Sequence, residues 1–498
     1  MLIENEFIQS DISIHDHFNL EQKVSYFLSS DNTNDEYKIE NYFFVPKNLG
    51  INSNTLTKER FYRRLHNYIR FRTPKFSLDF LISDNDNTPF KRLENIVNAL
   101  LVDHKNIKLI NKYDHQLKML GSIIRTTLRD HVYFIESSES TENDRQNLCK
   151  KYIYSCKRLI EKLSHLWEKV YVPTFPEDMR QSFLWTEEAV LIFINDYSEK
   201  IIQFYKSKKN KSFENYSEVE NDLLELISKN LKTRRKKINQ PKPDDKESKE
   251  RYLFRKRVLK KYISSVLFLD IRVRNEKPKL EYFLFAIAAG IAMILSTVLA
   301  YYFQKRFDKF SFPLIVGLGV IYMFKDRIKA LIQELFKKII NKYSYDHKIN
   351  INVPDYNMPV GNVREYFKFI DKENLPENIK KMHSKNEMEN LQRKILGENI
   401  FLYKKKITLF SSHINQAYSD INALADIDRL NIKDFLDNMD NPKKRVFVFK
   451  DDGFEWEDAG KYYFIHLITK VIAKGNESIG HYRIKMSRTG LKKVKRID

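Results

Sequence analysis

The sequence predicts a mainly α membrane protein: a cytoplasmic helical bundle with a small α+β N-terminal unit, a central transmembrane helical hairpin, and a C-terminal α+β region ending in an antiparallel β-meander. Three observations predict this fold class. One long segment in the middle of the chain is apolar and almost free of ionisable groups. Apolar residues recur at helical spacing through much of the remaining chain. Only 12 glycines and 13 prolines occur in 498 residues, so few positions interrupt a helix.

Composition limits the class of protein further. Lysine and arginine number 87 against 66 aspartates and glutamates, which leaves a formal charge of +21. With 42% hydrophobic and 13% aromatic residues the chain is not a disordered tail, and its length predicts roughly two to four domains. The two cysteines, Cys149 and Cys156, are too few for a disulfide framework or a cysteine zinc site, and their place beside an apolar stripe predicts burial.

The N-terminal region, 1–90, is expected to form the small α+β unit, because a strand pattern ends at Pro46 and a basic helix pattern ends at Pro74. From 91 to 228 the periodicity is helical, most clearly over 148–170, and several helices with short connections predict a bundle. The start of the chain has no basic segment followed by an apolar one, so no secretory signal is predicted there.

A basic linker and juxtamembrane helix are predicted over 229–279, where 19 lysines and arginines stand against 6 acidic residues. Anionic lipid attracts such a segment beside a membrane span, and nucleic acid is the rival partner because its phosphates attract the same charges. Lipid is favoured, since charge beside a span also sets topology. With two lysines that follow the hairpin, the expected membrane-surface basic set is Arg234, Arg235, Lys236, Lys237, Arg255, Lys256, Arg257, Lys260, Lys261, Lys337 and Lys338.

The first transmembrane span is predicted at 281–303. Apart from its first residue, this segment has no ionisable group except tyrosine hydroxyls. As a helix it covers about 34 Å, enough for a hydrocarbon core of about 30 Å. Tyr282 lies at one end, and Tyr301 and Tyr302 lie at the other, where interfacial aromatic residues are found. A buried helix of a soluble core is the alternative, but such a helix normally carries a polar stripe.

The second span is predicted at 312–324, which completes a hairpin over 280–324. It covers only about 20 Å as a helix, but Ser311 and Pro313 suit a helix start, and the pattern continues as an amphipathic stem over 325–348. A single span or a re-entrant second segment is the alternative. Basic residues concentrate on both outer flanks of the hairpin, so both flanking regions are expected in the cytoplasm.

Small side chains form a predicted packing face within the two spans. They recur every four residues in the first span, and two glycines occur in the second. Such faces let helices approach closely, so we expect packing between the two spans or between subunits of an oligomer. The residues are Ala288, Ala292, Ser296, Ala300, Gly317 and Gly319.

The C-terminal region divides in two. Residues 349–445 are predicted to be helical, with breaks at Pro354, Pro359 and Pro376. Residues 446–498 change to short apolar runs separated by turn residues, which predicts four strands in an antiparallel β-meander packed on the preceding helices.

No residue is predicted to be catalytic or to bind a metal, and no cofactor is expected. The chain has no GxxxxGK[ST], GxGxxG, HExxH, GxSxG or CxxC motif, which disfavours the chemistry that each of them supports. Asp355, Glu365 and Lys368 faintly resemble the carboxylate and lysine set of restriction-type nucleases, although the spacing from Glu365 to Lys368 is one residue too long. These side chains would have to meet in an open cleft.

These features predict a membrane-anchored, non-enzymatic cytoplasmic scaffold or sensor, with a membrane-acting stress or defence effector as its variant. The alternative is a membrane-tethered enzyme that acts on nucleic acid or lipid head groups. Expected partners are a bilayer with anionic head groups, an unknown cytoplasmic protein and a second copy of the chain, and nucleic acid stays open. Abundant asparagine, lysine and isoleucine are typical of a low-GC bacterium, so we expect an integral protein of the bacterial inner membrane with both terminal regions cytoplasmic.

Overall fold

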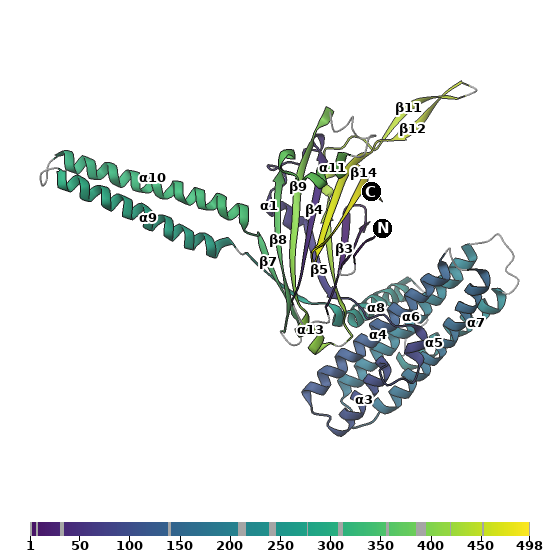
Figure 1. Ribbon diagram of the computed structural model, residues 1–498. Helices are drawn as coiled ribbons and strands as arrows, with labels where there is room; N and C mark the ends of the chain where they lie inside the picture. Colours follow the sequence, from purple (N-terminus) through teal and green to yellow (C-terminus); the bar gives the residue numbers. More distant parts are fainter. Residues whose placement is uncertain are drawn as a thin grey trace. The chain divides into compact units, whose positions relative to one another are not determined.

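The computed structural model describes residues 2–5, 8–29, 34–137, 141–207, 216–238, 246–275, 277–306, 312–354, 358–384, 395–418, 420–450 and 453–497. The chain forms two compact units (Figure 1). A β unit combines residues 1–70 with 269–498, and a helical unit comprises 71–268. In sequence, the helical unit is therefore an insertion into the β unit, and a second helical insertion follows within 277–343.

Two sheets build the β unit. The smaller has the order β1-β2-β3-β10-β5, and the larger has the order β15-β14-β13-β4-β9-β8-β7-β6. The smaller sheet comprises β1 (Leu2–Asn5), β2 (Ile8–Ile14), β3 (Asn19–Phe27), β10 (Ala423–Asn431) and β5 (Leu65–Phe71). The larger comprises β15 (Gly490–Arg496), β14 (Asn476–Ser487), β13 (Tyr463–Ala473), β4 (Asn34–Pro46), β9 (Glu398–Phe410), β8 (Met358–Ile370), β7 (His347–Val353) and β6 (Asp270–Asn275). Because β4 pairs with both β9 and β13, the two ends of the chain share one sheet.

The larger sheet is buried on both faces around β4. Phe43 belongs to the main apolar cluster, which also contains Leu430 of the smaller sheet. Phe44, the next residue, points to the opposite face, as expected from the alternation of side chains along a strand. There it joins a second cluster with Ile379 of α11 (Glu377–Ser384), so that α11 covers the outer face of the sheet.

The helical unit begins its helices where capping residues predict them. Thr88 caps α3 immediately before Pro89, and Thr141 forms a capping box with Asp144 in α5. Both cysteines are buried in its core and are not joined in a disulfide. The helices are α2 (Leu78–Ile82), α3 (Pro89–Val102), α4 (Ile107–Glu136), α5 (Glu142–Val170), α6 (Glu177–Ser207), α7 (Tyr216–Ile238) and α8 (Lys246–Ser264), followed by the 3-10 turn η2 (Ser265–Leu267).

The second insertion consists of α9 (Lys277–Arg306) and α10 (Phe312–Tyr343), which pack against each other (Figure 1). A separate ribbon is formed by β11 (Lys443–Lys450) and β12 (Gly453–Gly460). The shorter elements are η1 (Lys47–Leu49), α1 (Lys58–Arg64), η3 (Lys372–Asn374), α13 (Ser411–Ala417) and α14 (Lys433–Leu436).

The prediction of a mainly α membrane protein with a transmembrane hairpin is wrong. Among the described residues 55% are helical, but 30% are strand, in three sheets. Of the helices in the described part of the chain, only α9, over Glu281–Arg306, is long and apolar enough to span a membrane. The prediction fails for α10 because its apolar stretch, 312–324, covers only about 20 Å before Lys325 introduces charge.

The helical prediction for 349–445 is also wrong, since β8, β9 and β10 lie there. In β9 three consecutive lysines mask the strand alternation. Lys404 and Lys406 bind Glu40 and Glu36 of β4, whereas Lys405 between them is buried. The four strands predicted near the C-terminus fall within β11, β13, β14 and β15. They do not form one meander, because β11 pairs with β12 in a separate ribbon and the other three form the edge of the larger sheet.

Candidate functional site

A large apolar surface covers α9. A helix that faces water keeps one polar side. A helix that is apolar on most of its sides is therefore typically surrounded by other apolar groups. In this chain, however, most of the α9 surface is exposed. The exposed large side chains are Tyr282, Phe283, Ile287, Ile291, Met293, Ile294, Leu295, Val298, Leu299, Tyr301 and Tyr302. The α9 surface therefore needs an apolar surrounding that the described chain does not supply.

The predicted small-residue face lies largely between α9 and α10. On α9, Ala288 and Ala292 are buried, and Ser296 and Ala300 are half-buried. On α10, a Cβ at Gly317 would lie 2.8 Å from the ring of Phe303, so any larger residue would force this ring to shift. A Cβ at Gly319 would meet open space, so Gly319 does not take part in the contact. Within one chain, the face thus brings the two helices together.

Three members of the predicted membrane-surface basic set bind acidic side chains of the helical unit. Glu188 of α6 is buried, and Arg255 of α8 donates to it in a bidentate fashion, with bonds of 2.7 and 2.8 Å. Arg234 of α7 lies 3.7 Å from the same carboxylate, and Lys256 lies 2.5 Å from Asp196. These contacts join α6, α7 and α8, so the three basic residues have a structural role there.

The remaining members of that set are exposed, or their side chains lie outside the described residues. Arg257, Lys260, Lys261 and Lys337 are exposed, whereas the side chains of Arg235, Lys236, Lys237 and Lys338 are not described. The charge of Arg125, together with burial, lowers the pKa of Lys260. The ammonium of Lys337 lies 5.5 Å from the centre of the Phe285 ring of α9. Lipid binding by these residues stays a prediction.

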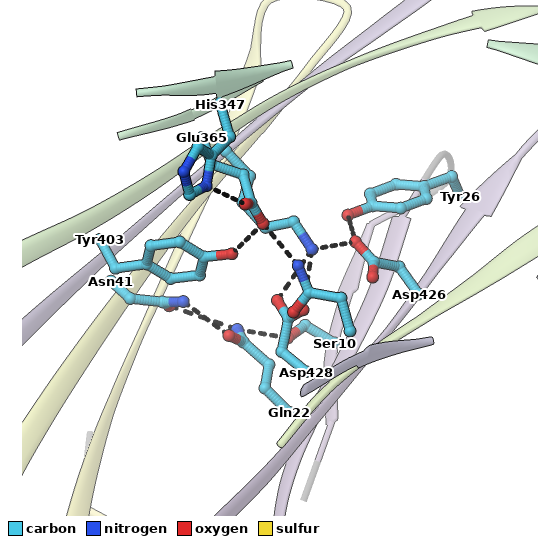
Figure 2. A network of polar contacts seen from close by, with 11 residues as sticks. Ser10, Gln22, Tyr26, Asn41, His347, Glu365, Tyr403, Asp426 and Asp428 are labelled. Carbon is cyan, nitrogen blue, oxygen red and sulfur yellow. Dashed lines mark hydrogen bonds and ion pairs between the residues drawn. The ribbon is translucent and has the colours of Figure 1, made fainter. Parts of the chain in front are cut away.

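Between the two sheets, charged residues form a buried network (Figure 2). Lys405 of β9 donates to Asp426 at 2.5 Å and to both carboxylate oxygens of Asp428 at 2.9 Å, and both partners lie on β10. Tyr26 of β3 donates its hydroxyl to Asp426 at 3.0 Å. Burial lowers the pKa of Lys405, but the two carboxylates outweigh it and raise the pKa overall. The ammonium therefore stays charged and ties the larger sheet to the smaller one.

Glu365 of β8 extends the network toward the edge of the larger sheet (Figure 2). Tyr403 and Asn67 each donate to its Oε1 atom at 2.6 Å, and His347 lies 3.9 Å from its Oε2 atom. Burial by itself raises the pKa of Glu365. His347, the charge of Lys405 and the two hydrogen bonds lower it by a larger amount, so the pKa lies below its ordinary value. For Asp428, in contrast, burial raises the pKa despite the neighbouring ammonium.

This network is enclosed, and its ion pairs connect β9 with β10. Lys405, Asp426, Asp428 and Glu365 are all buried. Buried ion pairs of this kind contribute little net stability, but breaking one is costly because a buried charge is left without compensation. We therefore interpret the network as a device that aligns β9 with β10.

The structure does not assemble the nuclease-like set. Glu365 is buried between the sheets, whereas Lys368, three residues along the same strand, is exposed on the opposite face of β8. Asp355 lies outside the described residues. Among the described residues, these two side chains therefore point apart and form no open acidic cleft.

Three buried histidines meet on the outer face of the larger sheet. His383 comes from α11, His466 from β13 and His481 from β14, and one ring nitrogen of each lies within 4.8 Å of the others. No sequence motif indicated this cluster. A partial signal existed in the tight turn at Lys474 and Gly475, whose φ angles of 46° and 85° suit a two-residue hairpin loop that sets the register of β13 and β14.

Comparison with known proteins identified no relative of the chain. No protein family, curated protein or solved structure matches the chain. The α9 surface and the buried clusters are therefore the basis on which the function is inferred.

Proposed function

We propose that this protein is a membrane-anchored, non-enzymatic sensor or scaffold that α9 attaches to a bilayer. The observation that carries the proposal is the exposed apolar surface of α9. The β unit and the helical unit carry the surfaces that bind a protein partner. We propose the bacterial inner membrane as the location, with both terminal regions in the cytoplasm.

Lipid is the surrounding that fits the α9 surface best. Removing one large apolar side chain from water is worth about 1.5–3 kcal/mol, and α9 exposes a whole series of them. A single protein partner would cover one stripe of the helix, whereas acyl chains cover all exposed sides at once. Tyr282 near one end, and Tyr301 and Tyr302 near the other, match the enrichment of tyrosine at membrane interfaces.

Strand pairing supports a topology with both flanking regions on one side of the membrane. β6 precedes α9, and β7 follows α10. These two strands are hydrogen-bonded neighbours, with Asp270 opposite Asn352 and Asn275 opposite His347. The two ends of the α9–α10 insertion therefore lie on the same side of a bilayer that α9 enters.

The buried polar groups favour a binding role over a tethered enzyme, because they are enclosed or point away from one another. The Lys405 network is enclosed between two sheets, and the members of the nuclease-like set that are described point apart. Glu188 is likewise closed off by Arg255 and Arg234. These clusters hold elements together and offer no bond-breaking geometry to a substrate.

The proposal is tested by removing the apolar character of α9. Met293, Ile294 and Val298 are more than 60% exposed, so lysines there should not disturb the fold of the chain. Each lysine costs about 2.5–3.5 kcal/mol at the centre of a membrane helix. We expect the wild-type protein to stay with membranes through salt and carbonate washes and to require detergent for release, and we expect the triple-lysine variant to be recovered in the soluble fraction.

The matched control places three lysines at exposed apolar positions of the helical unit, Val102, Ile107 and Tyr133. This control variant should remain in the membrane fraction, and circular dichroism should report the same helix content for all three proteins. Release of the wild-type protein by carbonate alone, or membrane retention of the α9 variant, would contradict the anchor.

A further inference from the structure

We propose that His383, His466 and His481 bind one divalent transition-metal ion of the zinc class. The three side chains are 7%, 2% and 3% exposed, and they bring three ring nitrogens together from two adjacent strands and one helix. The proposal concerns the outer face of the β unit and is independent of the membrane anchor. It does not rest on the network of Lys405, which lies on the other face of the same sheet.

The two sheet-borne histidines already have nearly the spacing of metal ligands. His466 Nδ1 lies 3.0 Å from His481 Nε2. Zinc–nitrogen bonds of about 2.0–2.1 Å at tetrahedral angles separate two ligand nitrogens by about 3.3–3.4 Å. A small separation of the two rings would therefore place both lone pairs on one ion, with the ring protons on the opposite nitrogens.

Strand register explains why these two rings meet. In the β13–β14 pairing, His466 lies opposite Arg483, and His481 lies opposite Ile468. The two histidines are thus diagonal neighbours on one face of the sheet, a relation within reach of large side chains. The sheet holds their backbones in place, so the pair is preorganised without a bound ion.

The third histidine is oriented by two contacts. His383 Nε2 lies 2.8 Å from Glu398 Oε2, and its ring stacks on Phe44 with centroids 3.8 Å apart. A carboxylate that accepts the proton of one ring nitrogen directs the other nitrogen toward a metal, as in many histidine metal sites. Glu398 is therefore a positioning residue that leaves Nδ1 of His383 as the ligand atom.

A cavity of about 890 Å³ borders the cluster on the side of His383. His383, Glu398 and Phe44 are among the residues that line it, whereas His466 and His481 are not. Three protein nitrogens would leave the fourth tetrahedral position to a water molecule, as in accessible zinc sites, whereas a closed structural site would have four protein ligands. The ligand set contains neither thiolates nor clustered carboxylates, which disfavours copper(I), calcium and magnesium.

The test uses the full-length protein, stripped of metal by a chelator and then titrated with Zn²⁺, or with Co²⁺ as a spectroscopic probe. We expect one ion per chain by elemental analysis and a Co²⁺ absorption spectrum of tetrahedral type. The variants H383Q and H466Q should each weaken Zn²⁺ binding at least 100-fold, and E398Q should weaken it about 10- to 100-fold. H104Q, at an exposed histidine of the helical unit, is the matched control and should bind as the wild type does.

Two results would overturn the proposal. One is a chelated wild-type protein that takes up neither ion at micromolar concentration. The other is binding that H383Q leaves unchanged, because that variant removes the ligand at the last turn of α11 and leaves both strands intact. Circular dichroism and sedimentation of each variant separate loss of the site from loss of the fold, and H383Q decides the question if H466Q does not fold.

Discussion

The two helical insertions in the β unit differ in what their surfaces require. α6, with 31 residues, buries Phe183, Ile194 and Ile201 and even encloses the carboxylate of Glu188 with arginines from α7 and α8. α9, with 30 residues, buries Ala288 and Ala292 against α10 but exposes most of its large apolar side chains. The first insertion therefore completes its core within the chain, and the second depends on its surroundings.

This difference teaches that secondary structure does not reveal where a helix belongs. The two helices differ in length by one residue, and both are continuous. What separates them is whether polar residues occupy one side, because a helix in a soluble core needs a polar side only where it meets water. The comparison is sharpened by substitutions that act on one insertion and not on the other.

The largest effect is expected from truncating a buried leucine of the helical unit. Leu128 of α4 is fully buried, so Leu128→Ala should lower the free energy of unfolding by about 2–5 kcal/mol through lost contacts and a residual cavity. Ile294→Ala, at a position of α9 that is 65% exposed, should change it by less than about 0.5 kcal/mol. Urea unfolding followed by tryptophan fluorescence measures the first effect, and amide hydrogen exchange in detergent measures the second. Equal losses for the two variants would remove the distinction between the insertions.

A medium effect is expected where α9 meets α10. Ala292 is buried in this contact, so Ala292→Leu should overpack it at a cost of about 1–3 kcal/mol. Ala286 of the same helix is exposed, and Ala286→Leu is the matched control. Faster amide exchange in α10 of the Ala292 variant alone is the expected result. If both variants exchange like the wild type, the two helices do not depend on this contact.

The smallest effect is expected in the pH dependence of the stability of the β unit, which carries both insertions. The pKa of Glu365 is lowered in the folded state, although burial opposes this, so the unfolded chain binds its proton more tightly. The stabilisation from this group is complete above the ordinary glutamate pKa and is lost as the pH falls through the lowered value. One proton contributes at most about 1.4 kcal/mol per pH unit.

The contribution of Glu365 to stability should therefore rise with pH below the ordinary glutamate pKa, and Glu365→Gln should flatten that part of the profile. Amide exchange of β8 and β9, measured at several acidic pH values, follows the effect. Glu161→Gln alters an exposed ion pair with Arg158 in the helical unit and is the control that should leave the profile of β8 and β9 unchanged. An unaltered slope in the Glu365 variant would show that another group accounts for the acid sensitivity.

Sequence patterns predicted local features well and distant pairings poorly. The strand signals in β13 and β14 and the helical stripe of α5 depend on neighbours in the chain, and the structure has elements there. Charged residues interrupt the strand alternation in the stretch of β8 to β10, as in the lysine run of β9, so the sequence pattern there wrongly predicts helix. Of those lysines, Lys405 looks like its neighbours in sequence and is the one that the two sheets enclose.

The sequence by itself determined the apolar character of α9, because composition alone decides how a long helix partitions between water and an apolar phase. It also determined the helical pattern within 91–228, for example in α4 and α5, whose period places one apolar face inward. Tertiary structure decided the rest. Asp426 and Asp428 meet Lys405 only because β10 faces β9 across two sheets, and His383 reaches the pair His466 and His481 only because α11 lies on their face. Both clusters join residues far apart in the chain, and no local pattern specifies which distant side chains will share a buried site.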